Sequence, residues 1–176
     1  AQRLGTQVES ISWMTADGFA AAVNAFMAQN FGAGKHTRVR RGYWSGFWLV
    51  FAICTVTSLI LLFFGAPIVA IFFKDPLALG HGADYLHILS ASQLLMGIQL
   101  LTSSAFAALG QSLLPSILVT GLMVSRIPLG TYLSGTALGV SGIWWSFSIT
   151  SNLAGLVLLI ALPLYMRKLE RRPVTA

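Results

Sequence analysis

The sequence predicts an all-α integral membrane protein with about five transmembrane helices. Of its 176 residues, 56% are hydrophobic and only 9% are charged, whereas about a quarter of the residues in a soluble domain are charged. Three stretches without any charged residue, 43–73, 87–125 and 127–166, each exceed the roughly 20 apolar residues that a helix needs to cross a bilayer. These features exclude most soluble enzymes, and the apolar content excludes a disordered chain.

The first helix is predicted over residues 6–30. This segment is less hydrophobic than the later ones but is rich in alanine. Gly32 and Gly34 follow it, and glycine is the favoured residue just past the C-terminal end of a helix. A basic loop, residues 35–41, is expected next.

The second helix is predicted over residues 43–64, and the Gly-Ala-Pro sequence at 65–67 marks its end. Residues 68–73 are apolar enough to form a short extension at the membrane surface. Lys-Asp-Pro at 74–76 predicts a turn, because Asp before Pro favours one.

The third helix is predicted over residues 84–109, with Gly110 as its end, and the fourth over residues 114–134. Pro115 falls in the first turn of the fourth helix, where its missing N–H group leaves no hydrogen bond unmade. Two helices joined by so short a connection are expected to run antiparallel.

Arg126 and Pro128 are expected to interrupt the fourth helix near its middle. The segment 135–142 contains three glycines and is expected to be a loop. The fifth helix is predicted over residues 143–165, and a basic tail, residues 167–176, follows it.

Eight of the eleven basic residues lie just outside apolar stretches, in two clusters. The clusters are Lys35, Arg38, Arg40 and Arg41, and Arg167, Lys168, Arg171 and Arg172. Lysine and arginine accumulate at the cytoplasmic ends of membrane helices, so we expect a multi-pass protein of the cell (inner) membrane with a cytoplasmic C-terminus. The net charge of +6 thus reflects orientation, and we expect no nucleic-acid partner.

A polar stripe follows the first predicted helix. With about 100° between successive residues, an arc of about 80° contains Thr6, Glu9, Asp17 and Asn24. A carboxylate in a low-dielectric cleft takes up protons more readily, so Asp17 and Glu9 are candidates for coupling transport to an ion. Alternatively, Asp17 pairs with Arg126 or bonds a neighbouring helix, and Glu9 is a solvated charge near the outer surface.

Polar residues inside membrane helices tend to mark function, because burying them in lipid is costly. The third helix is polar on two sides, which is typical of a helix inside a bundle or beside a water-filled path. Hydrogen bonding between helices is the alternative role for such residues. The candidates for lining a substrate cavity are Asn24, Gln93, Arg126 and Asn152.

Small residues spaced four apart predict places where two helices approach closely. The fourth helix contains two such pairs, Gly121 with Ser125 and Gly130 with Ser134. The fifth helix places Gly155 on the same face as Asn152. We interpret these residues first as packing positions.

The motifs expected of an enzyme are absent from the sequence. There is no glycine-rich phosphate loop, and the three histidines, His36, His81 and His87, lack the spacing of a metal site. We therefore expect a non-enzymatic protein with no catalytic residues, no bound metal and no organic cofactor.

The first predicted helix carries two distinctive stretches, VESISWMTADGFAAA at residues 8–22 and AQNFGAG at residues 28–34. Together they resemble the multidrug and toxic compound extrusion (MATE) family, whose members show a Gly-Gln-Asn-x-Gly-Ala-Gly ending followed by a basic loop. In this chain Ala28 replaces the usual first glycine, and Thr15 stands where proline is common.

Further stretches resemble the second half of the same family in the expected order. They are Gln93 to Gly110, the Arg-Ile-Pro-Leu sequence at 126–129 and the Gly-Ile-Trp-Trp sequence at 142–145. The resemblance implies a fold of two six-helix bundles, twelve helices in all, of which residues 1–176 supply helices eight to twelve of the C-terminal half. The N-terminal half and helix seven would be missing partners.

The resemblance also implies a function for the complete protein: export of drugs or other organic, often cationic, compounds in exchange for H⁺ or Na⁺. Family cation sites in this half often use carboxylates on helices seven and ten. The third helix of this chain, which corresponds to helix ten, has no carboxylate in its apolar span, since Asp84 lies at its outer end. From its position, Asp17 is the candidate to replace it.

Two alternative functions remain open at this point. One is a lipid-linked saccharide flippase of the same superfamily, whose cavity would be strongly cationic to hold a pyrophosphate, whereas Arg126 is the one basic residue available here. The other is a membrane assembly subunit without transport activity, which would need no charges in mid-membrane unless Asp17 and Arg126 simply pair. In each case the lipid bilayer is a partner, and for a transporter a small organic substrate is another.

Overall fold

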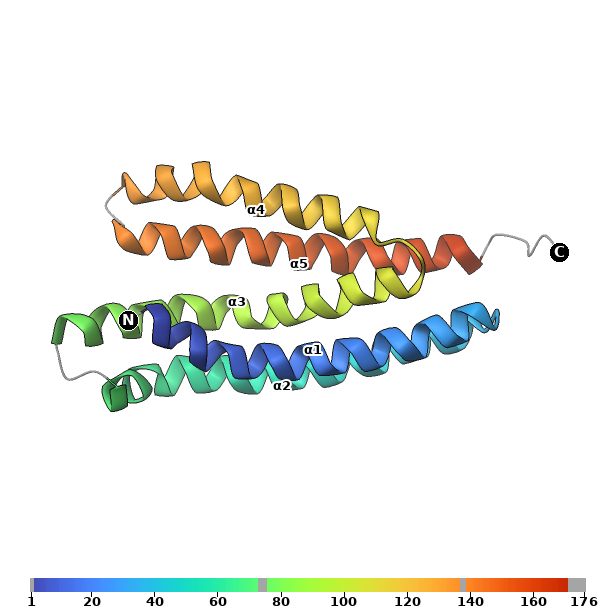
Figure 1. Cartoon of the computed structure of the whole chain (residues 1–176), viewed down its shortest axis with the longest axis horizontal. Helices are drawn as coiled ribbons and strands as arrows, with labels where there is room; N and C mark the ends of the chain where they lie inside the picture. Colours follow the sequence, from blue (N-terminus) through green and yellow to red (C-terminus); the bar gives the residue numbers. More distant parts are fainter. Residues whose placement is uncertain (1, 73–75, 137–138, 171–176) are drawn as a thin grey trace.

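The computed structural model describes residues 2–72, 76–136 and 139–170, and every regular element in these ranges is an α-helix. The five helices are α1 (Gln2–Gly32), α2 (His36–Phe72), α3 (Pro76–Ala108), α4 (Leu113–Ser134) and α5 (Val140–Glu170). The prediction of an all-α membrane protein is confirmed. The helices lie roughly parallel or antiparallel to one another (Figure 1).

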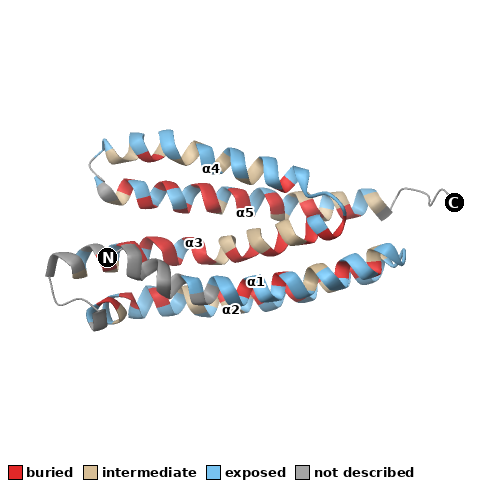
Figure 2. Ribbon diagram, in the orientation of Figure 1, coloured by how far each residue is buried: buried red, intermediate tan, exposed pale blue. Residues whose placement is uncertain are grey.

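Helix α3 is the central element of the bundle. It packs against α1, α2 and α5, whereas α4 packs almost entirely on α5 (Figure 1). Figure 2 shows the consequence for burial: buried residues gather along α3, while most of α4 is exposed. The chain thus forms two groups, α1 to α3 and the α4–α5 hairpin, joined where α3 meets α5.

Helix α2 differs most from its predicted limits. It begins at His36 and ends at Phe72, so the expected loop at 35–41 is mostly helical and the expected end at 65–67 is wrong. Arginine is a good helix former, which explains the early start. Pro67 removes one backbone hydrogen bond, and membrane helices tolerate such a loss; the ribbon bends near this end of α2 (Figure 1).

Three other boundaries also differ from the sequence expectation. Helix α3 begins at Pro76 instead of residue 84, because proline is well suited to the first helical position. Helix α4 continues through Arg126 and Pro128 without interruption. Helix α5 extends to Glu170, so part of the predicted basic tail is helical, and residues 171–176 of that tail lie outside the described ranges.

The two glycine turns predicted to end α1 and α3 are confirmed. Gly34 and Gly110 have φ angles of 69° and 74°, in the left-handed region that glycine adopts readily. In each turn an N–H group bonds the carbonyl oxygen five residues earlier, from Lys35 to Asn30 (2.8 Å) and from Gln111 to Phe106 (2.9 Å). These bonds satisfy carbonyl groups that a helix end otherwise leaves unpaired.

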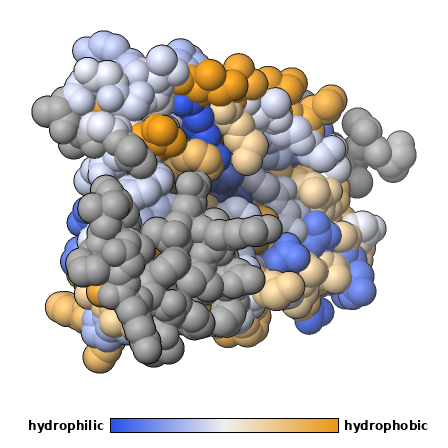
Figure 3. Space-filling model, turned by 60° about the vertical axis from the view of Figure 1, so that its left-hand side comes forward, coloured by the Kyte–Doolittle hydropathy of each residue, from blue (hydrophilic) through white to orange (hydrophobic). Residues whose placement is uncertain are grey.

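Within the described ranges, four helical segments are long and apolar enough to cross a bilayer: His36–Ala70, Gly82–Ala108, Leu113–Ser134 and Ser141–Leu169. Helix α1 lies beside α2 and α3 but is more polar. Many large hydrophobic side chains, such as Phe63, Ile127 and Ile160, are exposed on the outside of the helices. Figure 3 shows hydrophobic side chains along the upper edge of one face, with hydrophilic side chains between and below them.

Two separate clusters form the hydrophobic core. The larger one joins α1, α2, α3 and α5 around residues such as Met27, Tyr43, Phe106 and Leu158. The smaller one lies around Tyr85, Leu86 and Trp144, with Leu61 and Val69 from α2.

Helix packing relies on glycine at some of the predicted positions. Gly130 lies against Ser146, where an added Cβ would be 3.2 Å from the serine hydroxyl, and Gly155 lies against α3. Gly121, in contrast, has no neighbour within 4 Å of such an atom in the described part of the chain. Close approach is therefore confirmed for Gly130 and Gly155, while the space beside the Gly121 Cα is open among the described residues.

Candidate functional site

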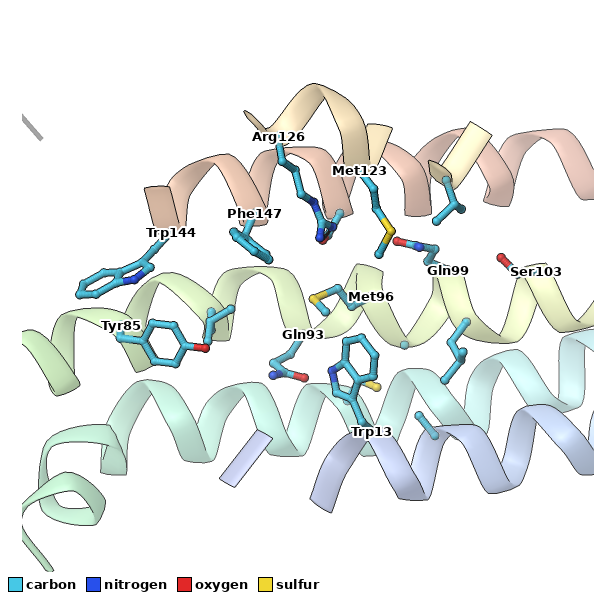
Figure 4. A pocket seen from close by; sticks show the side chains of 17 residues that line it. Trp13, Tyr85, Gln93, Met96, Gln99, Ser103, Met123, Arg126, Trp144 and Phe147 are labelled. Atoms are coloured by element: carbon cyan, nitrogen blue, oxygen red, sulfur yellow. Dashed lines mark hydrogen bonds between the residues drawn. The ribbon is translucent and has the colours of Figure 1, made fainter. Parts of the chain in front are cut away.

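A partly open cavity of about 550 Å³ is lined by residues of all five helices, including members of both hydrophobic clusters. This volume falls within the range of known ligand pockets, about 300 to 1,000 Å³. The lining residues are Trp13, Ala16, Cys54, Tyr85, Leu89, Gln93, Met96, Gly97, Gln99, Leu100, Ser103, Val119, Met123, Arg126, Trp144, Phe147 and Ser151. Figure 4 shows Arg126, Met123 and Phe147 on the α4–α5 side, opposite Gln93 and Trp13.

Aromatic rings and thioethers provide most of the cavity surface. Tyr85 and Trp144 meet edge to face, with ring centres 5.3 Å apart and planes at 79°. Met96 and Met123 line the cavity from α3 and α4, and the flexible methionine side chain adapts to irregular ligands. The cavity is therefore suited to bind a flat organic ring.

Arg126 is the charged residue among those that line the cavity, and α5 holds it in place. Its Nε atom donates to the Thr150 hydroxyl (2.8 Å) and its Nη2 atom to the Ser151 hydroxyl (2.7 Å). The guanidinium carbon lies 4.7 Å from the centre of the Phe147 ring, a geometry in which cation and ring attract by about 0.5–2 kcal/mol. Residues 147, 150 and 151 share one face of α5, which explains why one side chain reaches all three.

Polar groups from α3 lie across the cavity from Arg126. Gln93 is 2% exposed and lines the cavity together with Gln99 and Ser103. The sequence predicted a cavity position for Gln93, and the structure places it there. Gln99 and Ser103, which lie on a different side of α3 from Gln93, also line the cavity.

The carboxylates proposed for ion coupling lie elsewhere. Asp17 is exposed on α1 and does not line the cavity, although its neighbour Ala16 does. No ion pair joins Asp17 to Arg126 in the described ranges, where the arginine bonds the hydroxyls of Thr150 and Ser151. The side chain of Glu9 lies outside the described part.

The two asparagine candidates differ in their surroundings, and neither lines the cavity. Asn24 joins α1 to α3: its Nδ2 atom donates to the Ser104 carbonyl oxygen (2.8 Å) and hydroxyl (3.2 Å). The Asn152 side-chain oxygen is buried without a hydrogen-bond partner among the described residues, and its nitrogen lies 3.5 Å from the Ser148 hydroxyl. Asn24 thus connects two helices.

Several lining residues were not predicted from the sequence, namely Trp13, Tyr85, Met96, Met123 and Phe147. Each is an aromatic or thioether residue, and large hydrophobic side chains of this kind are also exposed on the outside of the helices, as Trp48 and Phe63 are. The available signal was spacing: Phe147 and Ser151 are four residues apart and both line the cavity, whereas Asp17, four residues after Trp13, does not. Spacing alone does not tell which face of a helix lines a cavity.

Metal binding finds no support in the described part of the chain, where no group of three or more His, Cys, Asp or Glu side chains is placed to hold an ion. The one cysteine, Cys54, is a buried free thiol beside Gly97. The polar and aromatic groups that line the cavity are aromatic rings, amides, hydroxyls and one guanidinium.

The long apolar helices define a multi-pass membrane protein with a cavity among its helices. Residues 1–133 match the sequence profile of the MatE family. The chain belongs to the MatE family of membrane transporters.

A curated relative from Shewanella oneidensis, named "FAD transporter", is 25% identical over 156 residues. The match covers 86% of this chain and 34% of the relative. The chain therefore spans about a third of the length of the curated relative that it matches.

Proposed function

We propose that this chain is part of a secondary active transporter that exports drugs or other organic compounds in exchange for H⁺ or Na⁺. The observation that carries the proposal is the cavity of about 550 Å³ lined by aromatic rings, thioethers and a few polar groups. Membership of the MatE family supports the same function. The name of the relative, FAD transporter, is consistent with a substrate that contains flat rings.

The orientation that we propose places both basic clusters in the cytoplasm. The α1–α2 turn and the C-terminal end of α5 lie at the same end of the bundle (Figure 1), with Arg167 and Lys168 in the last turn of α5. Because basic residues favour the cytoplasmic side, the arrangement supports a cytoplasmic C-terminus in the cell (inner) membrane.

Ion coupling is assigned in this proposal to Asp17, with Glu9 as a second candidate. An exposed carboxylate near the middle of α1 is costly in lipid, so we propose that the rest of the transporter covers this face. Protonation or Na⁺ binding at Asp17 would then change the relative stability of the inward-open and outward-open states.

The experiment uses the longest gene product that contains this chain, reconstituted in proteoliposomes with an imposed pH or Na⁺ gradient. Export of a panel of neutral, cationic and anionic aromatic compounds is measured with the wild-type protein and with Asp17→Asn. We expect the variant to fold but to lose gradient-driven export, while Asp84→Asn, which changes an exposed carboxylate at the outer end, retains it. Normal gradient-driven export by Asp17→Asn would disprove the coupling role.

A second experiment tests whether the chain acts alone. Five helices do not provide the two bundles between which the substrate of such a transporter would move, so residues 1–176 expressed alone in a transporter-deficient host should not confer drug resistance. Resistance conferred by this segment would contradict the proposal that it needs an N-terminal partner half.

The alternative functions receive less support. A lipid-linked saccharide flippase would need several basic groups for a pyrophosphate, and Arg126 is the single basic residue among the lining residues. An assembly subunit would be favoured by an ion pair between Asp17 and Arg126, but Arg126 bonds Thr150 and Ser151.

A further inference from the structure

The charge of Arg126 has no counter-ion within the described part of the chain. None of the 17 lining residues is an aspartate or glutamate. Two acidic residues directly follow or precede lining residues in the sequence: Asp17 follows Ala16, and Asp84 precedes Tyr85. Both are exposed, and neither is among the lining residues. Among the described lining residues, Arg126 therefore gives the cavity a net positive charge.

Arg126 also keeps hydrogen-bonding capacity for a ligand. A guanidinium group has five N–H donors, and the two hydroxyls of Thr150 and Ser151 occupy two of them. No described residue accepts from the remaining three. Hydroxyl partners fix the orientation of the group without neutralising its charge, which leaves a planar cation suited to two oxygens of a carboxylate or phosphate.

The surroundings of Arg126 select for a ring next to that anionic group. Phe147 lies beneath the guanidinium at 4.7 Å, and Trp13, Tyr85 and Trp144 also line the cavity. These rings provide flat apolar surface on both sides of the cavity (Figure 4). A ligand that combines an aromatic ring with an anionic oxygen group would use both kinds of contact at once.

We propose that the cavity selects aromatic organic anions, with the carboxylate or phosphate of the ligand bound by Arg126 and its ring packed among the aromatic side chains. The inference rests on the proposed transport function and specifies the charge class of its substrate. It also distinguishes this cavity from one that takes organic cations, for which a fixed guanidinium would be repulsive.

The test measures binding separately from transport. The longest gene product that contains this chain is purified in nanodiscs of neutral phosphatidylcholine, and quenching of tryptophan fluorescence reports ligand affinity. Three probes share one ring system and differ in charge: 9-anthracenecarboxylate, 9-anthracenemethanol and 9-anthracenemethylammonium. Partitioning into protein-free nanodiscs is subtracted, and flavin mononucleotide against riboflavin repeats the comparison for a phosphate.

We expect the carboxylate to bind at least about tenfold more tightly than the alcohol, and the ammonium compound most weakly, because charged hydrogen bonds are the stronger kind. Arg126→Met should reduce the preference for the anion to about twofold or less. Arg126→Lys should keep part of it, since the charge remains but the planar fork is lost. Arg38→Met, which removes an exposed arginine near the start of α2, should leave it unchanged.

Equal affinity for the three anthracene probes in the wild-type protein, or tightest binding of the ammonium compound, would overturn the inference. So would an anion preference that survives in Arg126→Met. If that variant does not fold, Thr150→Val combined with Ser151→Ala keeps the arginine but removes its partners. This double variant should show a smaller preference for the carboxylate over the alcohol than the wild type does. An unchanged preference would count against the inference.

Binding and transport can fail independently in this design. Export of neutral or cationic compounds by a protein that shows no anion preference would leave the proposed function intact and disprove the charge class. Tight binding of the anionic probes without export of any compound would disprove the transport function and leave the binding site established.

Discussion

Gly155 of α5 lies directly against the backbone of Leu95 in α3. A Cβ atom built on the glycine would be 2.5 Å from the Leu95 carbonyl oxygen and 3.1 Å from its carbonyl carbon. Because the obstacle is backbone, no side-chain rotation can relieve it. This contact sets the distance between the central helix and the α4–α5 hairpin.

We predict that Gly155→Ala destabilises the protein by about 1–3 kcal/mol, the usual cost of overpacking. The matched control is Gly121→Ala, since nothing lies within 4 Å of that position in the described part. The control should be neutral or gain up to about 1 kcal/mol from helix propensity. The midpoint of thermal unfolding in detergent, followed by tryptophan fluorescence, compares the two; equal midpoints would contradict the close contact.

The two asparagines that the sequence proposed as cavity residues should differ in their effect on stability. Asn24→Ala removes the donor to Ser104, which costs about 0.6 kcal/mol for a typical bond between membrane helices. Asn152→Ala removes a buried oxygen that has no partner among the described residues. Since an unsatisfied buried group costs about 1–3 kcal/mol, that variant should match or exceed the wild type in the same thermal assay.

A stability loss in Asn152→Ala equal to that in Asn24→Ala would indicate that a group outside the described chain bonds the Asn152 oxygen. Neither substitution should alter ligand affinity by more than about twofold, because neither residue lines the cavity.

The adjacent tryptophans Trp144 and Trp145 provide a matched test of the cavity. Trp144 is 6% exposed, lines the cavity and packs edge to face on Tyr85, whereas Trp145 is 39% exposed. An aromatic pair contributes about 0.5–1.5 kcal/mol beyond its buried area. We therefore predict that Trp144→Leu weakens binding of an uncharged anthracene probe about two- to tenfold, measured by quenching of the remaining tryptophans.

Trp145→Leu should leave the affinity within twofold of wild type. If both substitutions weaken binding equally, the probe binds to the outer surface of α5 and not in the cavity.

Cys54 offers a chemical report on access to the cavity. Its side chain is 3% exposed, with the sulfur against Gly97, and it is the one cysteine in the sequence. Alkylation by N-ethylmaleimide should be at least tenfold slower for folded residues 1–176 than in sodium dodecyl sulfate, because only the exposed thiolate reacts. Ser112→Cys, in the exposed α3–α4 turn, should label rapidly in both conditions, and equally fast labelling at Cys54 would refute its burial.

The sequence predicted the number and order of the helices because each long apolar stretch is a local signal. Gly34 and Gly110 located two turns for the same reason: a positive φ angle is a local requirement. The ends of α2 could not be predicted in this way. Pro67 reads as a helix end in a soluble chain, but in a membrane helix the alternative to an imperfect hydrogen bond is an unpaired group in lipid.

The candidate site was predictable only in part. Gln93 and Arg126 stood out because polar side chains are rare in apolar helices, and both line the cavity. The hydroxyl partners of Arg126 were not predicted, because they depend on how α4 rotates against α5. For the same reason the polar stripe of α1 divides: Asn24 faces Ser104, while Asp17 is exposed.

The cavity draws lining residues from every helix, from Trp13 of α1 to Ser151 of α5. It therefore exists only when the whole chain has folded, and any compound that binds in it favours the assembled state. A ligand present at 100 times its dissociation constant would stabilise the fold by about 2.7 kcal/mol. During synthesis a compound that binds in the cavity would then also help the newly made helices to assemble, so that the cellular amount of the protein would rise with the supply of that compound.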